Sequence, residues 1–237
     1  MSSKFKVQSK LPFVLLNVAM TADGKIATAD RIFLPFSSAC DQRHLLELRA
    51  TADAVMSGAR TVGPAPVTLG PGPARFRRLR LKRGLAEYNL RVVVSGSGSV
   101  NPQAEIFRHR FSPVIVLTTR RASPANLRRL RAVANVKICG TDKINLRTAL
   151  RWLCEKWGVK RLLCEGGGEL NAALFRAGLV DELHLTICPI ILGGRQAPTI
   201  ADGSGFTRLA KAAPLQIKSF KRVGNEIFAV FSMCRQK

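Results

Sequence analysis

Three consecutive glycines stand between an acidic residue and the start of a helical pattern. The apolar residues Leu162, Leu163 and Cys164 lead to Glu165, and residues 166–168 are all glycine. The pattern that follows has helical spacing and ends in a further glycine (Leu170, Ala173, Leu174, Ala177, then Gly178). Because glycine costs backbone entropy, we expect the turn to need a positive φ or the close approach of another group.

Glycine turns of this kind can bind phosphate, because exposed backbone amides at the start of a helix attract anions. Two more turns, "SGARTVG" at 57–63 and "SGSGS" at 95–99, follow other apolar runs. Ligands of open α/β sheets lie at the carboxyl ends of strands, so three such turns favour an extended ligand with several phosphates, such as a dinucleotide. Neither a Walker P-loop nor a G-x-G-x-x-G motif follows the first apolar run. The alternative is that the triple glycine is a tight packing turn.

Strand patterns alternate with helical patterns along the chain. This alternation predicts an α/β fold with a mainly parallel sheet covered on both faces, and a single domain over residues 1–237 with its core at 12–232. The last two strands predict an antiparallel hairpin. The expected strands are 13–20, 53–58, 90–99, 113–119, 136–140, 162–164, 181–192, 215–220 and 227–233, and the expected helices begin near 38, 124, 146 and 169.

The formal net charge of +23 is unevenly distributed. Residues 54–86 and 106–141 contain no acid, and "RFRRLRLKR" at 75–83 lies in a segment, 63–88, that is expected to be a basic Gly/Pro/Arg loop. One interpretation is a solvated basic surface, and the other is a patch that binds a polyanion. No RNA-binding signature accompanies the charge, so we expect nucleic-acid binding, if any, to be non-specific.

Six cysteines are scattered along the chain without a C-x-x-C pair or a histidine cluster. This pattern predicts reduced thiols in a cytoplasmic protein and no structural zinc site. No run approaches the roughly 20 apolar residues of a membrane helix, so we expect no membrane association. The three histidines form no recognisable catalytic or ligand set.

Four motifs together resemble the riboflavin-biosynthesis pyrimidine reductases, which are the dihydrofolate-reductase-like RibD C-terminal family. They are "NVAMTADGKIAT", "SGARTVG", "RVVVSGSG" and "LLCEGGGELNAALFRAGLVDELHLTICPIILGG". The likeness covers residues 12–232 and is closest to the stand-alone archaeal-type reductases, since the zinc deaminase signature is absent. The resemblance implies a dihydrofolate-reductase-like sheet, a homodimer, and NADPH-dependent reduction of the ribosyl group of a ribosylaminopyrimidine 5′-phosphate to ribityl.

The resemblance also implies roles around the cofactor. The nicotinamide and diphosphate would meet the glycine turn and the helix after it, and Ala19 would line the nicotinamide pocket. The second turn would supply Gly58 and Thr61, and Ser95 would lie on the adenosine side. A 2′-phosphate there needs a basic partner, and charge and strand-end position alone suggest Arg60, Arg120 or Arg121. The cofactor residues implied at the glycine turn are Gly166, Gly167, Gly168, Glu169, Leu170 and Asn171.

On the substrate side, the resemblance implies that Glu165 contacts substrate, Lys25 stands near the reacting sugar, and Arg49 holds the 5′-phosphate. Ser37 is implied as a further substrate contact. Two segments depart from the family pattern. "TVGPAPVTLGPG" at 61–72 lacks the acids usual after Thr-Val, and "PFS" at 35–37 replaces the usual Trp/Arg-Ile-Ser/Thr.

The sequence leaves three functions open. The first is the pyrimidine reductase itself. The second is a paralogous NADPH reductase of another substrate, such as a pterin, which the lost acids would favour. The third is a retired reductase fold that acts as a basic nucleic-acid-binding module, against which the presence of Lys25, Arg49 and Glu165 argues.

Overall fold

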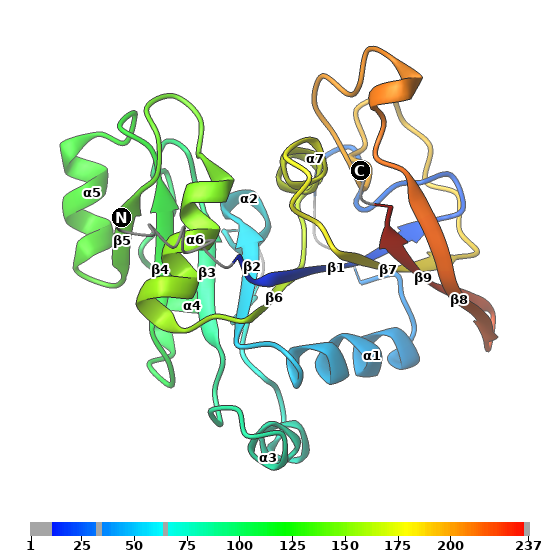
Figure 1. The fold of residues 1–237 in the computed structure, drawn as a ribbon, viewed down its shortest axis with the longest axis horizontal. Helices are drawn as coiled ribbons and strands as arrows, with labels where there is room; N and C mark the ends of the chain where they lie inside the picture. The colour runs from blue at the N-terminus through cyan, green and yellow to red at the C-terminus, as the bar shows by residue number, and fades with distance from the viewer. Residues whose placement is uncertain (1–10, 32–34, 64–65, 235–237) are drawn as a thin grey trace, which may run out of the picture.

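The computed structural model describes residues 11–31, 35–63 and 66–234. Within these residues nine strands form one mixed sheet in the order β5-β4-β3-β2-β6-β1-β7-β9-β8 (Figure 1). The strands are β1 (Phe13–Thr21), β2 (Ala54–Gly58), β3 (Leu90–Val94), β4 (Val114–Thr118), β5 (Asn135–Ile138), β6 (Arg161–Cys164), β7 (Glu182–Cys188), β8 (Leu215–Val223) and β9 (Glu226–Met233). The first seven pair in parallel, and β9 pairs antiparallel with both β7 and β8. The predicted fold class is confirmed.

The helices cover both faces of the sheet because successive residues of a buried strand point to opposite sides. In β1, Leu15 packs into one core cluster, whereas Leu16 and Val18 pack into the other. Helices α6 (Leu146–Trp157) and α7 (Gly168–Arg176) bury their apolar residues on the Leu16 side, whereas α1 (Ala39–Arg49), α4 (Glu105–Arg108) and α5 (Pro124–Arg131) bury theirs on the Leu15 side. Two apolar cores therefore sandwich the sheet.

The helix boundaries follow capping chemistry. The Ser38 hydroxyl accepts hydrogen bonds from the amides of Cys40 and Asp41 at the start of α1. The Ser123 side chain accepts a hydrogen bond from the amide of Asn126 at the start of α5, where Pro124 holds the first helical position. Gly158 ends α6 in the left-handed region, with φ at 67°. These signals are local, and the structure confirms them.

The segment 63–88 was expected to be a loop, and this prediction is wrong for its central part. Residues Ala74–Lys82 form α3, and the short α2 (Ala59–Val62) precedes it. The basic run is helical because Phe76 and Arg80 turn inward together while the other arginines stay partly or fully exposed. Arginine is a good helix former, so the loop prediction gave too much weight to the flanking glycines and prolines.

Two histidines without a predicted role, His44 of α1 and His184 of β7, contact each other. Nε2 of His44 is 3.1 Å from Nδ1 of His184, and Nε2 of His184 is 2.8 Å from Oε1 of Glu182. Lys218 of β8 donates to the other oxygen of Glu182 at 2.6 Å. Burial lowers the pKa of both imidazoles, so the pair is held in its neutral form at neutral pH.

None of the described helices has the length and apolar character needed to cross a membrane. Within the same residues, no group of three or more His, Cys, Asp and Glu side chains is placed to hold a metal ion. All six cysteines are free, and Cys139, Cys164 and Cys188 are buried.

Candidate functional site

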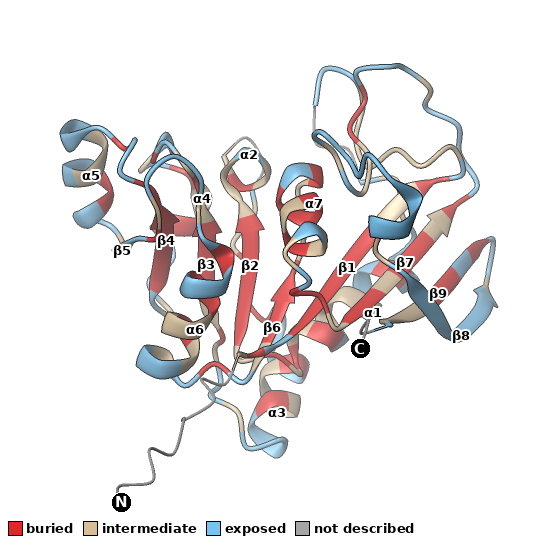
Figure 2. Cartoon of the chain, turned by 45° about the horizontal axis from the view of Figure 1, so that its top comes forward, coloured by how far each residue is buried: buried red, intermediate tan, exposed pale blue. Residues whose placement is uncertain are grey.

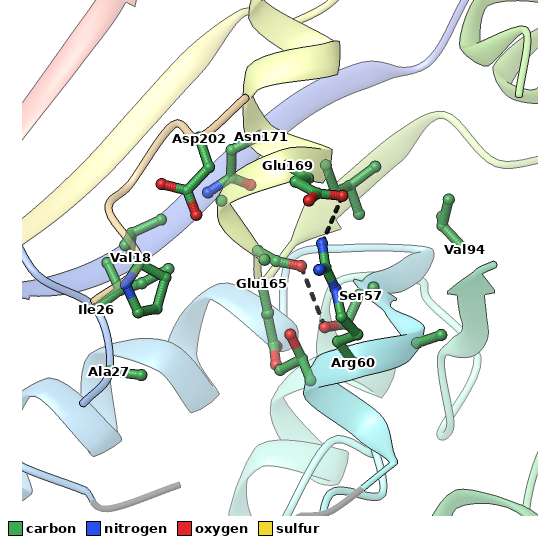
Figure 3. Close-up of a pocket in the computed structure, with 18 of the residues that line it drawn as sticks. Val18, Ile26, Ala27, Ser57, Arg60, Val94, Glu165, Glu169, Asn171 and Asp202 are labelled. Carbon is green, nitrogen blue, oxygen red and sulfur yellow. Dashed lines mark hydrogen bonds and ion pairs between the residues drawn. The ribbon is translucent and has the colours of Figure 1, made fainter. Parts of the chain in front are cut away.

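A cavity of about 1210 Å³ opens at the carboxyl ends of β1, β2, β3 and β6. All three glycine-containing turns of the sequence line it, as the position of strand ends in a parallel sheet requires. Further parts of the wall come from helices α1 and α7, from the loop residues 26–27, 31, 35–37, 66–69 and 142–144, and from the loop at 198–204. Figure 3 shows Val18 of β1, Ser57 of β2, Glu165 after β6 and Asp202 of the loop at 198–204 around a common space.

Glycine is required at the three positions of the triple turn for different structural reasons. Gly166 and Gly167 adopt φ values of 87° and 94°, which side chains rarely tolerate. Gly168 begins α7, and a Cβ there would lie 2.4 Å from both Oδ2 of Asp202 and the carbonyl oxygen of Thr199. The turn thus combines positive φ with a close approach, and the approaching group within the chain is the loop at 199–202.

The second glycine turn packs directly on the first. The amide of Gly58 donates to the carbonyl of Gly166 at 3.1 Å, and a Cβ on Gly167 would lie 3.4 Å from Oγ1 of Thr61. Ser95, from the third turn, is buried beside the same cavity, and its amide donates to the Leu117 carbonyl. The first amides of α7 have no partners within the helix, and Gly168 and Glu169 of its first turn line the cavity.

Arg49 and Glu165 form a two-pronged ion pair in the cavity wall. Nε and Nη2 of Arg49 donate to the two carboxylate oxygens at 2.5 and 2.6 Å, and the side chains are 12% and 11% exposed. Nη1 donates to the carbonyl of Gly70 at 2.7 Å. Each of the two Nη groups keeps a second N–H, so the predicted contact between Arg49 and a phosphate would have to form alongside the ion pair.

Arg60 and Glu169 pair at 2.5 Å across the mouth of the cavity, where both side chains are more than half exposed (Figure 3). Glu169 raises the pKa of Arg60 through this hydrogen bond. Asn171 is buried and donates from Nδ2 to the carbonyl of Ile200, while Leu170 packs into the core. Both residues line the cavity as expected, and both also hold the fold.

The comparisons with known proteins agree with this geometry. Residues 12–229 match the RibD C-terminal domain family. The chain belongs to this family. It is 34% identical over 222 residues to the 2,5-diamino-6-ribosylamino-4(3H)-pyrimidinone 5′-phosphate reductase of Methanothermobacter thermautotrophicus, which covers 94% of this chain and 98% of that protein. The enzyme of the same name from Archaeoglobus fulgidus is 36% identical over 219 residues, 92% of this chain and 96% of that protein.

Solved structures share the RibD C-terminal fold. A pyrimidine reductase-like protein from Corynebacterium diphtheriae superposes with a TM-score of 0.79 at 24% identity and covers 95% of this chain and 93% of that chain. Acinetobacter baumannii RibD gives 0.76 at 20% identity, covering 95% of this chain and 59% of that one.

Of the predicted site residues, Ala19 and Ser37 lie in the cavity wall and Lys25 lies outside it. Ala19 of β1 and Ser37 line the cavity, and Ser37 also accepts a hydrogen bond from Gln42 at 3.1 Å. Lys25 is not part of the cavity wall that the described residues form, and its ammonium group lies 3.5 Å from the carbonyl of Ala197. Its neighbours Ile26 and Ala27 do line the cavity, so the backbone of Lys25 lies at the rim of the cavity.

Asn17 is a cavity residue that the sequence analysis missed. Its side chain is 8% exposed, and its Oδ1 is buried with no hydrogen-bond partner among the described residues. Leu16 pairs with Cys164 in the β1–β6 register, so Asn17 and Glu165 are the next residues along two adjacent strands. A polar residue between apolar neighbours in a central strand was the available signal.

Asp202 and Lys143 are further cavity residues that were not predicted. Asp202 accepts hydrogen bonds from the amide and hydroxyl of Thr199, and its carboxylate lies toward Asn171 in Figure 3. Lys143 precedes α6 and lines the cavity together with Ser95 and Ser97. Arg120 and Arg121, which were considered as basic partners for Ser95, are not among the lining residues.

Proposed function

We propose that the protein is an NADPH-dependent reductase that converts the ribosyl group of 2,5-diamino-6-ribosylamino-4(3H)-pyrimidinone 5′-phosphate to ribityl in riboflavin biosynthesis. Two relatives at 34% and 36% identity carry the name of this reductase over nearly their whole length. The cavity of about 1210 Å³ exceeds the roughly 300–1,000 Å³ of a pocket for one ligand, so cofactor and substrate fit side by side.

The residues around the glycine turn fit a dinucleotide. Side chains are absent where the chain bends at 166–168, and the N-terminus of α7 and the turn at 58–61 lie on either side. When bound, NADPH would supply the hydride that reduces C1 of the opened sugar. The roles of the chain would be to bind and orient the two ligands and to stabilise the negative charge that develops on the imine nitrogen until that nitrogen gains a proton.

The observation that carries the substrate assignment is the buried amide oxygen of Asn17. It has no hydrogen-bond partner among the described residues, and the β1–β6 register places Asn17 beside Glu165. A buried acceptor without a donor costs about 1–3 kcal/mol, and an N–H group of a ligand would remove this cost. The 2-amino group of a diaminopyrimidinone is such a donor, whereas a deaminated uracil presents a carbonyl oxygen at that position. Asn17 and Glu165 thus favour a substrate that is still aminated.

The Glu165 carboxylate suits the sugar hydroxyl groups or the nitrogen that gains a proton as C1 gains the hydride. Arg49 keeps this carboxylate oriented through two hydrogen bonds. Lys25, at the rim, would reach the reacting sugar after a change of rotamer, and Ser37 would contact the substrate from the same side. We therefore propose that the Arg49–Glu165 ion pair lies at the centre of the part of the cavity that binds the substrate.

Selectivity for NADPH over NADH is proposed to come from Lys143. A 2′-phosphate needs hydroxyl and cationic partners, and Lys143 shares the cavity wall with Ser95 and Ser97. Arg60, the other candidate that lines the cavity, already pairs with Glu169.

We also propose a homodimer through the β8–β9 hairpin. The edge strand β8 is exposed along most of its length (Figure 2). On it Leu215, Ile217 and Phe220 are 40%, 66% and 68% exposed. An irregularity between Ile217 and Ser219 shifts the register, so all three pair with odd-numbered residues of β9 and share one face. An exposed apolar face on an edge strand is an association surface. The cytoplasmic location inferred from the cysteines stays a prediction.

Calorimetric titration with NADPH and NADH at low and high salt, followed by turnover assays, tests this function. The salt series is needed because a protein of charge +23 attracts any polyphosphate. We expect salt-resistant binding that favours NADPH, is lost in Gly167→Val, and supports faster turnover of the diaminopyrimidinone than of its deaminated form. Binding that disappears with salt and survives Gly167→Val would contradict the proposal and favour a polyanion-binding module.

A further inference from the structure

The basic helix α3 carries an arginine that is inside the protein. Arg80 is 1% exposed, although the run around it contains six basic residues in nine positions and no acid. Burial lowers its pKa, which the charge of Asp53 partly opposes. Burying a guanidinium is costly unless its N–H groups are all engaged, so its partners indicate why it is there.

The partners of Arg80 are backbone carbonyl groups. Nη1 donates to the carbonyls of Arg49 and Ala52, both at 2.6 Å, and Nε donates to that of Ala86 at 2.9 Å. Arg83 adds a bond to the carbonyl of Ala50 at 3.1 Å. The last carbonyls of a helix have no partner within the helix, and a cation there also matches the helix dipole. Arg80 and Arg83 therefore cap α1 from a different helix.

The capped end of α1 is where the substrate-side ion pair begins. Arg49 is the last residue of α1, so its backbone carbonyl is held by Arg80 while its side chain holds Glu165. Its third donor, Nη1, reaches Gly70, which lies in the segment that leads into α3. Hydrogen bonds with α3 and with the segment before it therefore hold Arg49 at two points. Arg80 binds its backbone carbonyl, and Gly70 binds its side chain.

We propose that Arg80 is a positioning residue for catalysis, which sets the orientation of the Arg49–Glu165 pair through the carbonyl of Arg49. A displacement of the end of α1 would move the guanidinium and turn the carboxylate away from the reacting sugar. Small displacements of such a group cost much in rate, because catalysis depends on alignment. The inference rests on the proposed function in that the pair acts on the pyrimidine substrate.

Three variants of α3 separate positioning from general stability. Arg80→Lys keeps the charge and loses the fork that reaches three carbonyls. Arg83→Met removes the bond to Ala50, and Arg78→Met is the matched control because Arg78 is exposed on the same helix and has no hydrogen bond among the described residues. We expect Arg80→Lys to lower kcat/KM for the pyrimidine by about tenfold or more, with NADPH affinity within about twofold of the wild type.

The deciding measurement is a double-mutant cycle with Arg49→Lys. If Arg80 acts through Arg49, Arg80→Lys has little further effect on kcat/KM once Arg49 is changed, whereas a merely structural role predicts independent effects that multiply. Multiplying effects, or an equal loss of NADPH affinity, would overturn the proposal.

Two further readouts keep the inference testable. If Arg80→Lys does not fold, Arg83→Met must show the same selective loss, smaller in size and absent in the Arg49→Lys background; behaviour equal to Arg78→Met would overturn the proposal. If the wild type does not reduce the pyrimidine, the proposed function fails on its own. The crystal structure of Arg80→Lys then decides, and an undisturbed pair at 2.5 and 2.6 Å would refute positioning.

Discussion

Arg49 faces Glu165 with two parallel N–H···O bonds, although 116 residues separate them in the chain. One comes from the end of α1 and the other from the residue after β6. The guanidinium offers this largely buried carboxylate both an opposite charge and a matched geometry beside the cavity.

Glu165→Gln is expected to lower kcat by about a hundredfold, the lower range for loss of a group that handles charge in the transition state. The amide keeps the shape and loses the charge, so NADPH affinity should stay close to that of the wild type. Stopped-flow single-turnover and equilibrium titration measure the two quantities. Glu105→Gln, at a surface glutamate, serves as the control. A near-wild-type rate in Glu165→Gln would exclude a catalytic role.

Gly168→Ala is expected to destabilise the fold by about 1–3 kcal/mol, because the added methyl meets Asp202 and Thr199 at 2.4 Å and the loop must move. NADPH binding should weaken as well, since the same loop lines the cavity. Denaturant unfolding measures the stability. Gly96→Ala is the stability control, because a Cβ there meets no atom within 4 Å. Equal stability of the two variants would show that the loop yields freely.

Lys143→Ala is expected to raise the KM for NADPH by about tenfold, since a hydrogen bond to a charged group is worth about 1.5 kcal/mol or more. The KM for NADH, which lacks the 2′-phosphate, should hardly change. Steady-state kinetics with both nucleotides checks the difference. Arg121→Ala is the control, and a loss of NADPH preference there rather than at Lys143 would reassign the 2′-phosphate site.

Acid should destabilise the protein through the histidine pair. Burial lowers the pKa of His44 and His184 in the folded state below 6.5, the ordinary value. Between these folded values and 6.5 the unfolded chain binds more protons, so the stabilisation is complete above pH 6.5 and is lost as the pH falls below it. Differential scanning calorimetry from pH 8 to pH 5 should show a falling Tm.

The matched variants for this effect are His44→Gln and His109→Gln. His44→Gln should flatten the pH dependence, whereas His109→Gln, at an exposed histidine that meets Glu105 at 2.7 Å, should leave it in place. Identical pH profiles in all three proteins would place the titration elsewhere.

Ile217→Glu and Phe220→Glu are expected to convert a dimer into a monomer, because a charge would be buried in the proposed β8 interface. Light scattering coupled to size-exclusion chromatography gives the mass. Lys221→Glu, a charge change on the same strand, tests whether added acid alone has this effect. A wild-type protein that is already monomeric would contradict the proposed dimer.

Local signals determined the elements that the sequence predicted correctly. The apolar runs, Ser38, Ser123 and Gly158 act on residues within a few positions of themselves, so a strand or a helix end follows from them directly. The same local reasoning failed at α3, where a helix is held by one inward arginine whose partners lie in α1 and the segments that follow α1 and α3.

The sequence by itself determined the fold class, the glycine turn and the edge of the sheet at which the cavity lies, because the alternating patterns and the glycines with positive φ occur in consecutive residues. Tertiary structure alone decided that Arg49 meets Glu165, that Oδ1 of Asn17 has no hydrogen-bond partner among the described residues, and that Arg80 is buried. These relationships depend on which strands become neighbours and how far α1 lies from the sheet. Such distances arise from packing over the whole core, and no short stretch of residues encodes them.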